Sequence, residues 1–176
     1  MTAKRDVPVQ RLTPEGEGPL LRALPVEAPI AIEFNGIGYA VMMATPTDLE
    51  DFATGFALSE RIAASPDDIL AIDPFETPQG WIVRITLSQA RVEPMVERVR
   101  VRVSESSCGL CGLENLEQVS RPLPPITVKA EIGKAAIFAA LNALQAHQPL
   151  NAATGGTHAA AFCTPEGHIL FAREDV

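Results

Sequence analysis

The chain has 176 residues, of which 47% are apolar, and a formal net charge of −8 at pH 7. That length and apolar content suffice for a sizeable core, in one large or two small domains. The acidic balance disfavours general nucleic-acid binding. The N-terminus shows no apolar signal-peptide core, and no apolar run approaches the roughly 20 residues that span a bilayer. We therefore expect a cytoplasmic protein without membrane contact.

The first part of the chain predicts an irregular segment followed by a β-hairpin. Residues 1–24 read as a flexible lead-in, because proline and glycine interrupt any periodicity. The apolar runs Ile30–Phe34 and Tyr39–Ala44 are typical of strands. Asn35-Gly36 between them is the strongest short signal for a hairpin turn.

A helix and three further strands are predicted before the cysteines. Thr47-Asp48-Leu49-Glu50 has the spacing of a capping box, and apolar residues at helical spacing extend the helix over 48–62. Ile69–Phe75 and Trp81–Leu87 read as strands around a turn. Val99–Val103 alternates valine with arginine, which predicts a strand. We assign residues 25–103 to a small α+β domain.

Residues 104–125 hold a cysteine loop, with a possible short helix over Leu113–Ser120, and a proline-rich connector. After it, an alanine-rich stretch predicts a helix over 131–147 that ends before Pro149. Two apolar runs, Ala159–Cys163 and Ile169–Ala172, predict strands around a turn. The connector marks a domain boundary, so residues 126–176 are assigned to a second domain.

The candidate chemistry centres on Cys108-Gly-Leu-Cys111, which holds two of the three cysteines of the chain. A Cys-x-x-Cys pair can supply half a metal site, a redox disulfide, or a thiolate that accepts and passes on sulfur. Structural zinc is disfavoured, since the chain has no second Cys-x-x-Cys and the candidates left to complete a site are Cys163, His158 and His168. A zinc deaminase is rejected because His158 lacks the following glutamate and the motif order is reversed.

Two other candidate features surround the cysteines. Five arginines precede them, and we read these either as a solvated face or as a positive approach to an anionic ligand: Arg84, Arg91, Arg98, Arg100 and Arg102. Thr154-Gly155-Gly156-Thr157-His158 can present backbone N–H groups to a phosphate, or can be a tight turn before a buried strand. His158 is either a satisfied core histidine or a cofactor contact.

Six short motifs, in one order along the chain, resemble the FdhD family of sulfurtransferases required for formate dehydrogenase activity. They are Asn35-Gly36, the stretches 42–50, 55–60 and 107–112, Thr154–Ala160 and Glu174-Asp175-Val176. The resemblance implies an α/β fold: an α+β N-terminal portion, then a cytidine-deaminase-like α/β/α domain that is truncated here. It also implies a sulfurtransferase in which Cys108 carries a persulfide and Cys111 assists.

The same resemblance implies a cofactor and partners. Sulfur would come from a cysteine desulfurase and pass to the molybdenum bis-molybdopterin guanine dinucleotide cofactor before this enters formate dehydrogenase. The predicted cofactor contacts are Gly155, Gly156, Thr157 and His158, no resident metal is expected, and we expect a homodimer. The alternatives are a thiol-disulfide oxidoreductase using Cys108 and Cys111, and a non-enzymatic adaptor between desulfurase and apo-dehydrogenase.

Two departures from the family pattern carry expectations. Arg61 stands where the family usually has glycine. The family continues past Val176 into a further motif and a long C-terminal portion, so we expect weak cofactor binding by this chain. We also expect exposed apolar strand surface beside Ile169–Ala172.

Overall fold

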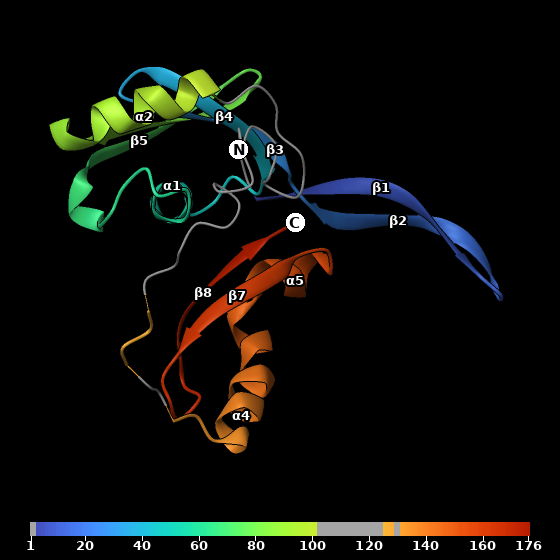
Figure 1. Ribbon diagram of the computed structural model, residues 1–176. Helices are drawn as coiled ribbons and strands as arrows, with labels where there is room; N and C mark the ends of the chain where they lie inside the picture. The colour runs from blue at the N-terminus through green and yellow to red at the C-terminus, as the bar shows by residue number, and fades with distance from the viewer. Residues whose placement is uncertain (1–2, 102–124, 129–130) are drawn as a thin grey trace.

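The computed structural model of the protein describes residues 3–101, 125–128 and 131–176. Within these ranges it has a two-stranded ribbon, a four-stranded sheet, a second two-stranded sheet and four α-helices (Figure 1). The mixed α and β class agrees with the prediction. The predicted helix over Leu113–Ser120 lies outside the described residues.

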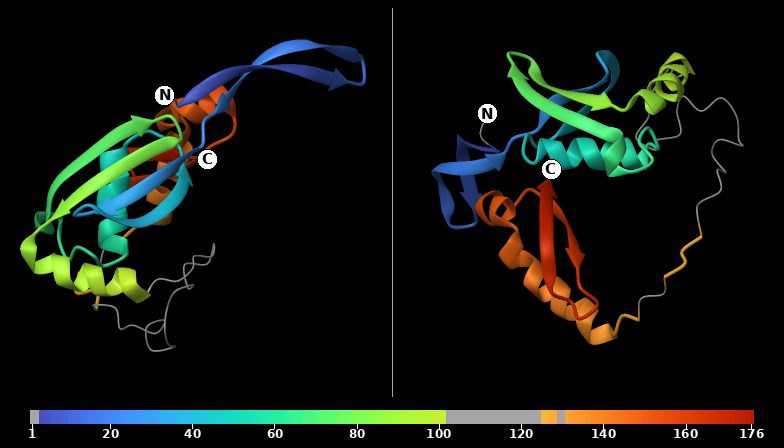
Figure 2. Two further views of the ribbon diagram at one scale, coloured as in Figure 1. Left: turned by 90° about the horizontal axis from the view of Figure 1, so that it is seen from above. Right: turned by 90° about the vertical axis from the view of Figure 1, so that its left-hand side faces the viewer.

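The N-terminal segment forms a β-ribbon, so the prediction of an irregular lead-in is wrong. Strands β1 (Lys4–Thr13) and β2 (Gly16–Pro25) pair antiparallel without a register shift. The ribbon projects away from the rest of the molecule (Figure 1 and Figure 2). Prolines do not prevent this pairing, because each strand of a two-stranded ribbon has one free edge that needs no backbone donor.

The central sheet has the strand order β4-β3-β6-β5, from β3 (Ala28–Phe34), β4 (Ile37–Ala44), β5 (Ile69–Thr77) and β6 (Gly80–Leu87). Strands β3 and β6 are parallel neighbours, whereas the two outer pairs are antiparallel hairpins. Asn35 and Gly36 both have positive φ, at 48° and 80°, as a tight hairpin turn requires. These four strands confirm the sequence prediction.

Helix α1 (Leu49–Ser59) covers one face of this sheet and lies between it and the C-terminal hairpin (Figure 2). Alternate residues of β3 and β6 point into the same core as the buried face of α1, as the period of two in a strand requires. The largest fully buried side chains are Phe34, Ile30, Ile32, Ile85, Met95 and Val83.

Helix α2 (Gln89–Val101) replaces the strand that we predicted at Val99–Val103, so that prediction is wrong over the residues that the structure describes. The alternation of valine and arginine there is short, whereas the helix is fixed at its start. Asp68, at the end of the 3-10 helix η1 (Pro66–Asp68), accepts hydrogen bonds from the Ser88 hydroxyl and Arg91 Nε. Met95 then anchors the helix in the core.

The C-terminal part packs α4 (Lys134–Leu144), the 3-10 helix η2 (Gln145–His147) and α5 (Pro149–Thr154) beside the hairpin of β7 (His158–Cys163) and β8 (Ile169–Asp175) (Figure 1). The two strands confirm the prediction, and the helix begins three residues later than expected. Pro149 opens α5 as well as following the earlier helix, as its fixed φ allows at a first helical position. Leu170 and Phe171 are 58% and 54% exposed, which confirms the expected apolar strand surface.

Candidate functional site

The cysteine pair Cys108 and Cys111 lies outside the described residues, between the end of α2 at Val101 and the point where the description resumes at 125. Two of the five arginines that precede the pair are described with their side chains. Arg84 Nε lies 2.9 Å from Glu33, and Arg91 Nε lies 2.9 Å from Asp68. Both therefore form ion pairs within the chain, which favours the reading of a solvated structural face at these two positions.

The Thr154–His158 motif forms the connection from α5 to β7. Its backbone N–H groups donate within the chain: Gly155 to the Asn151 carbonyl at 2.6 Å, Gly156 to Thr154 Oγ1 at 3.3 Å and Thr157 to Asn151 Oδ1 at 3.3 Å. Gly155 has φ of 68°, a conformation that favours glycine. The geometry therefore favours the tight turn, and phosphate binding by these N–H groups stays a prediction.

The same turn packs against the base of the N-terminal ribbon. A Cβ atom at Gly156 would lie 3.2 Å from Pro25, and one at Gly155 would lie 3.8 Å from Arg22 Nη2. The two glycines thus allow a close approach between segments far apart in the sequence, in addition to the turn itself.

Glu174 of the C-terminal motif fixes the turn from the opposite side. Its carboxylate accepts hydrogen bonds from the backbone N–H of Leu150 at 2.9 Å and of Asn151 at 2.6 Å, at the start of α5. It also accepts one from the Thr157 hydroxyl at 3.1 Å. A carboxylate beside the first N–H groups of a helix is favoured by the helix dipole as well. Glu174 is therefore a structural residue of the site.

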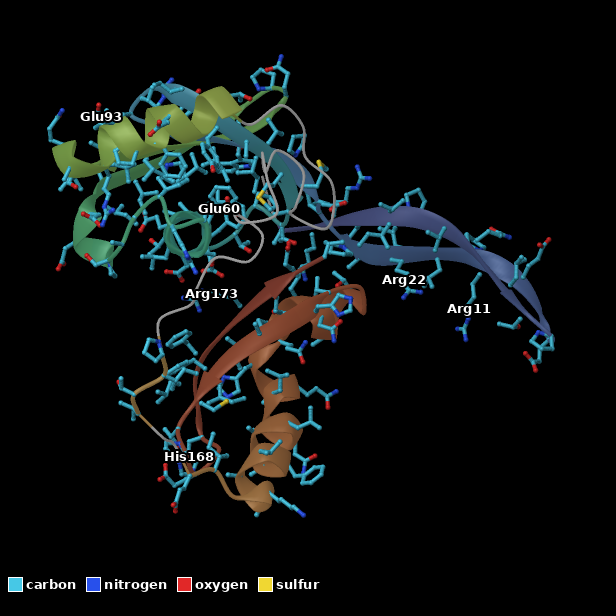
Figure 3. All side chains as sticks on the ribbon, in the orientation of Figure 1. Arg11, Arg22, Glu60, Glu93, His168 and Arg173 are labelled. Carbon is cyan, nitrogen blue, oxygen red and sulfur yellow. The ribbon has the colours of Figure 1, made fainter. Side chains whose placement is uncertain are left out.

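Arg173 and Asp175 on the other face of β8 join the C-terminal hairpin to α1 and to the segment before it. Asp175 Oδ1 accepts the backbone N–H of Thr45 at 2.7 Å, and Arg173 Nε donates to Asp51 at 2.6 Å. The hydrogen bond with Asp51 raises the pKa of Arg173, so the guanidinium stays charged. Figure 3 shows Arg173 between the two parts of the molecule.

The capping box predicted at the start of α1 is wrong. Asp48 is the N-cap residue and makes no side-chain cap hydrogen bond, and its backbone is left-handed with φ of 50°. Its carboxylate instead lies 3.5 Å from Arg173 Nε. A non-glycine residue in this conformation is uncommon and costs free energy, so the contacts across the two parts hold it in place.

A cavity of about 450 Å³ lies at this junction. Its lining brings together three motifs that the sequence singled out, at 42–50, 154–160 and 174–176, and also Arg173 and Asp51, which sequence reasoning missed. Thr45 is 3% exposed, and its Oγ1 has no hydrogen-bond partner among the described residues. The cavity is lined by Ala44, Thr45, Thr47, Asp48, Asp51, Phe52, His158, Ala159, Ala160, Arg173, Glu174 and Asp175.

His158 is the one predicted cofactor contact that lines this cavity, and its side chain is exposed. The remaining soft ligands weighed for zinc are spread along the hairpin: Cys163 ends β7 and is half-buried, and His168 lies at the far turn (Figure 3). Within the part of the chain that the structure describes, no group of three His, Cys, Asp or Glu residues could hold a metal ion. No described helix is long and apolar enough to cross a membrane.

The fold and the motif-lined cavity define a mixed α+β protein in two parts, and sequence comparison names its family. The profile of the FdhD/NarQ family matches residues 25–176, so the chain belongs to this family. Sulfur carrier protein FdhD of Variovorax paradoxus is 42% identical over 151 residues, which are 86% of this chain and 54% of the relative. The protein of the same name from Bordetella petrii is 39% identical over 85% of this chain and 54% of its own length.

A third relative agrees with this assignment, and one solved structure agrees with the fold. Sulfur carrier protein FdhD of Cupriavidus necator is 42% identical over 85% of this chain and 52% of the relative. A crystal structure of a protein assigned as a formate dehydrogenase accessory protein, from Desulfotalea psychrophila, superposes with a TM-score of 0.72 at 18% identity. It covers 99% of this chain and 63% of the other, and at that identity it supports the fold alone. The chain spans about half the length of the curated relatives it matches.

Proposed function

We propose that this chain is a sulfur carrier in the maturation of formate dehydrogenase, with the sulfur held as a persulfide on Cys108. The observation that carries the proposal is the Cys108-Gly-Leu-Cys111 pair within the region that matches the FdhD/NarQ family. Relatives named sulfur carrier protein FdhD, 39–42% identical to this chain, support it. The proposed partners are a cysteine desulfurase as donor and formate dehydrogenase as recipient, in the cytoplasm.

The proposed loading step is redox-neutral. The Cys108 thiolate attacks the terminal sulfur of a persulfide on the donor desulfurase, the new S–S bond forms, and the donor cysteine leaves as its thiolate. Delivery would transfer the terminal sulfur to the cofactor in a reduced state, because this sulfur is at the oxidation level of elemental sulfur and the acceptor must supply two electrons, and Cys108 would leave as its thiolate. Cys111 assists the release. A thiolate is the reactive form in both directions, so the step requires a cysteine that is accessible to both partners.

We propose that the molybdenum bis-molybdopterin guanine dinucleotide cofactor, as transient substrate, contacts this chain at the cavity beside His158. The cavity is concave, has apolar walls from Phe52 and the alanines of β7, and holds an unpartnered hydroxyl at Thr45. Such a combination is typical of small-molecule sites. Gly155, Gly156 and Thr157 would act by positioning His158, and phosphate contact through them remains part of the proposal.

Mass spectrometry of the intact chain tests sulfur transfer. After incubation with a desulfurase and cysteine, the wild type should gain the mass of one sulfur atom, Cys108→Ala should gain none, and Cys111→Ala should gain less. Cys163→Ala is the matched control and should load like the wild type. A Cys108–Cys111 disulfide that turns over with thioredoxin would support an oxidoreductase instead, and binding of both partners without either modification would support an adaptor.

Calorimetric titration with GDP, a stand-in for the guanine end of the cofactor, tests the cavity. We expect weak binding by this chain, and His158→Ala should weaken it further. His168→Ala is the control, because His168 lies on the same hairpin but at the opposite end (Figure 3). Equal losses in the two variants would contradict the assignment of His158.

We also propose that the chain forms a homodimer through its exposed apolar surface on the C-terminal part. Phe162 and Phe171 stack at 5.5 Å on β7 and β8, and Phe138 of α4 is exposed as well. Light scattering after size exclusion should give twice the mass of the chain. A monomer at all concentrations would contradict this.

A further inference from the structure

The two faces of the N-terminal ribbon differ in charge. Because β1 and β2 pair without a register shift, directly opposed residues share a face and successive residues alternate. One face carries three arginines and no acidic side chain, whereas the other carries Lys4, Asp6 and Glu17. The first, here called the arginine face, consists of Arg5, Val7, Val9, Arg11, Thr13, Gly16, Gly18, Leu20, Arg22 and Leu24.

The arginines of this face lie at two places along the ribbon. Arg5 opposes Leu24, and Arg22 opposes Val7. These two arginines are therefore diagonal neighbours, with Cα atoms about 7–8 Å apart. Arg11 opposes Gly18, which precedes Arg22 by four residues on β2. Arg11 and Arg22 are therefore about 13 Å apart along the ribbon. All three are exposed, and none forms an ion pair or hydrogen bond with a residue that the structure describes. Figure 3 shows Arg11 and Arg22 on the same side of the ribbon.

Like charges on neighbouring strand positions are unfavourable, so the pairing of the ribbon itself does not explain them. Apolar side chains lie between the two cationic positions. Val9 opposes Leu20 midway, and Leu20 is 45% exposed. Nearer the tip, Gly16 and Gly18 have open space where side chains would stand. A hollow of about 460 Å³ lies there beside Arg11, Thr13 and Leu20, with Glu15 and Glu17 also in its lining. The face therefore reads cation, apolar, cation over roughly four residues of extended chain.

We propose that the arginine face binds an extended segment of a partner protein with the pattern acidic–x–apolar–x–acidic. Residues i, i+2 and i+4 of a strand point to one side, so two carboxylates four residues apart reach Arg22 and Arg11 while the residue between them packs on Val9 and Leu20. Arginine binds a carboxylate through two parallel hydrogen bonds, which favours this partner chemistry.

An acidic polypeptide is favoured over a nucleic acid, because a phosphate backbone carries a dense charge that the net charge of −8 of this chain repels. The three arginines lie outside the family match at residues 25–176, so the inference goes beyond the proposed sulfur carrier function and does not rest on it.

Fluorescence anisotropy with the full chain tests this. The probe is a labelled peptide, Gly-Ser-Glu-Thr-Leu-Thr-Glu-Ser-Gly, and the reference peptide places Glu-Leu-Thr-Glu-Thr at its centre, with its acidic residues on opposite sides. The wild type should bind the first peptide better, and more weakly as salt rises. Arg11→Gln with Arg22→Gln should weaken binding about tenfold, since each exposed ion pair contributes up to about fivefold.

Gln10→Glu with Leu21→Glu is the matched control, because it changes the net charge equally on the opposite face of the same strands and should retain most of the preference. Equal binding of the two peptides, or an equal loss in both double variants, would overturn the proposal. So would tighter binding of single-stranded DNA or of anionic lipid vesicles than of the peptide. If the wild type self-associates without binding the peptide, and the variant Arg11→Gln with Arg22→Gln does not self-associate, the arginine face binds a second copy of the chain. This result would also overturn the proposal. Circular dichroism confirms that both double variants fold.

Discussion

Glu174→Ala should loosen the turn that positions His158. Glu174 accepts three hydrogen bonds, from Leu150 N, Asn151 N and the Thr157 hydroxyl, at 2.6–3.1 Å. Hydrogen bonds to a charged group contribute about 1.5–3 kcal/mol each, and the half-buried donors recover part of this from water. We therefore expect a loss of about 2–4 kcal/mol of local stability, which corresponds to a rise in opening of roughly 30-fold to 1,000-fold.

Hydrogen exchange followed by mass spectrometry measures this directly for peptides that cover α5 and the turn, since exchange reports local opening. Glu174→Gln should lose less local stability than Glu174→Ala, because the amide oxygen of glutamine still accepts a hydrogen bond, although it carries no charge. Glu93→Ala is the control, since Glu93 is exposed on α2 (Figure 3) and distant from the turn. Unchanged protection of residues 149–157 in Glu174→Ala would refute the structural role of Glu174.

Three further outcomes are expected. Hydrogen bonds from Ala64 N–H and from Arg91 lower the pKa of Asp68 from its ordinary 3.8. The ionised carboxylate therefore stabilises the fold above pH 3.8, and this stabilisation is lost as the pH falls through the lowered pKa. Urea unfolding should show Asp68→Asn less stable than the wild type near neutral pH, with the difference closing below pH 3.8. Gly167→Ala should lower the free energy of unfolding by about 1–3 kcal/mol, because Gly167 has φ of 90° and a Cβ there would collide with the Ala136 carbonyl. Gly18→Ala is the control and should leave stability nearly unchanged, because Gly18 has open space around it. Equal thermal midpoints for the two variants would contradict this prediction. Elemental analysis of the purified chain should find no stoichiometric zinc, whereas one zinc per chain that is lost in Cys108→Ala would favour a structural metal site.

The sequence predicted the secondary-structure elements that are determined by neighbouring residues. Asn35-Gly36 gave the hairpin because both positions need positive φ, and the apolar runs gave the strands of the central sheet. The ribbon of β1 and β2 was missed because proline and glycine were read as breakers, although a free strand edge tolerates proline. The strand predicted at Val99–Val103 failed because contacts of Asp68 and the burial of Met95 favour a helix, and both depend on tertiary structure.

The sequence predicted the motifs that line the candidate site, but it did not predict that they meet at one cavity. Nothing local in the sequence shows that Asp175 holds Thr45, 130 residues away, or that Asp48 is turned toward Arg173 in place of capping its own helix. Long-range pairings of this kind decide where the cavity lies. The spacing of the cysteine pair left three kinds of chemistry open, and the family resemblance implied the sulfur carrier among them. The pair itself lies outside the described residues.

The identity of the cysteine that carries the sulfur is the most direct test of the proposed sulfur carrier function. Peptide mapping by mass spectrometry, after loading by a desulfurase and alkylation of the persulfide, assigns the added sulfur to one cysteine. We expect the added sulfur on the peptide that contains Cys108, attached to that residue and not to Cys111 or Cys163. Sulfur found on Cys163, or equal loading of Cys108→Ala and the wild type, would contradict it.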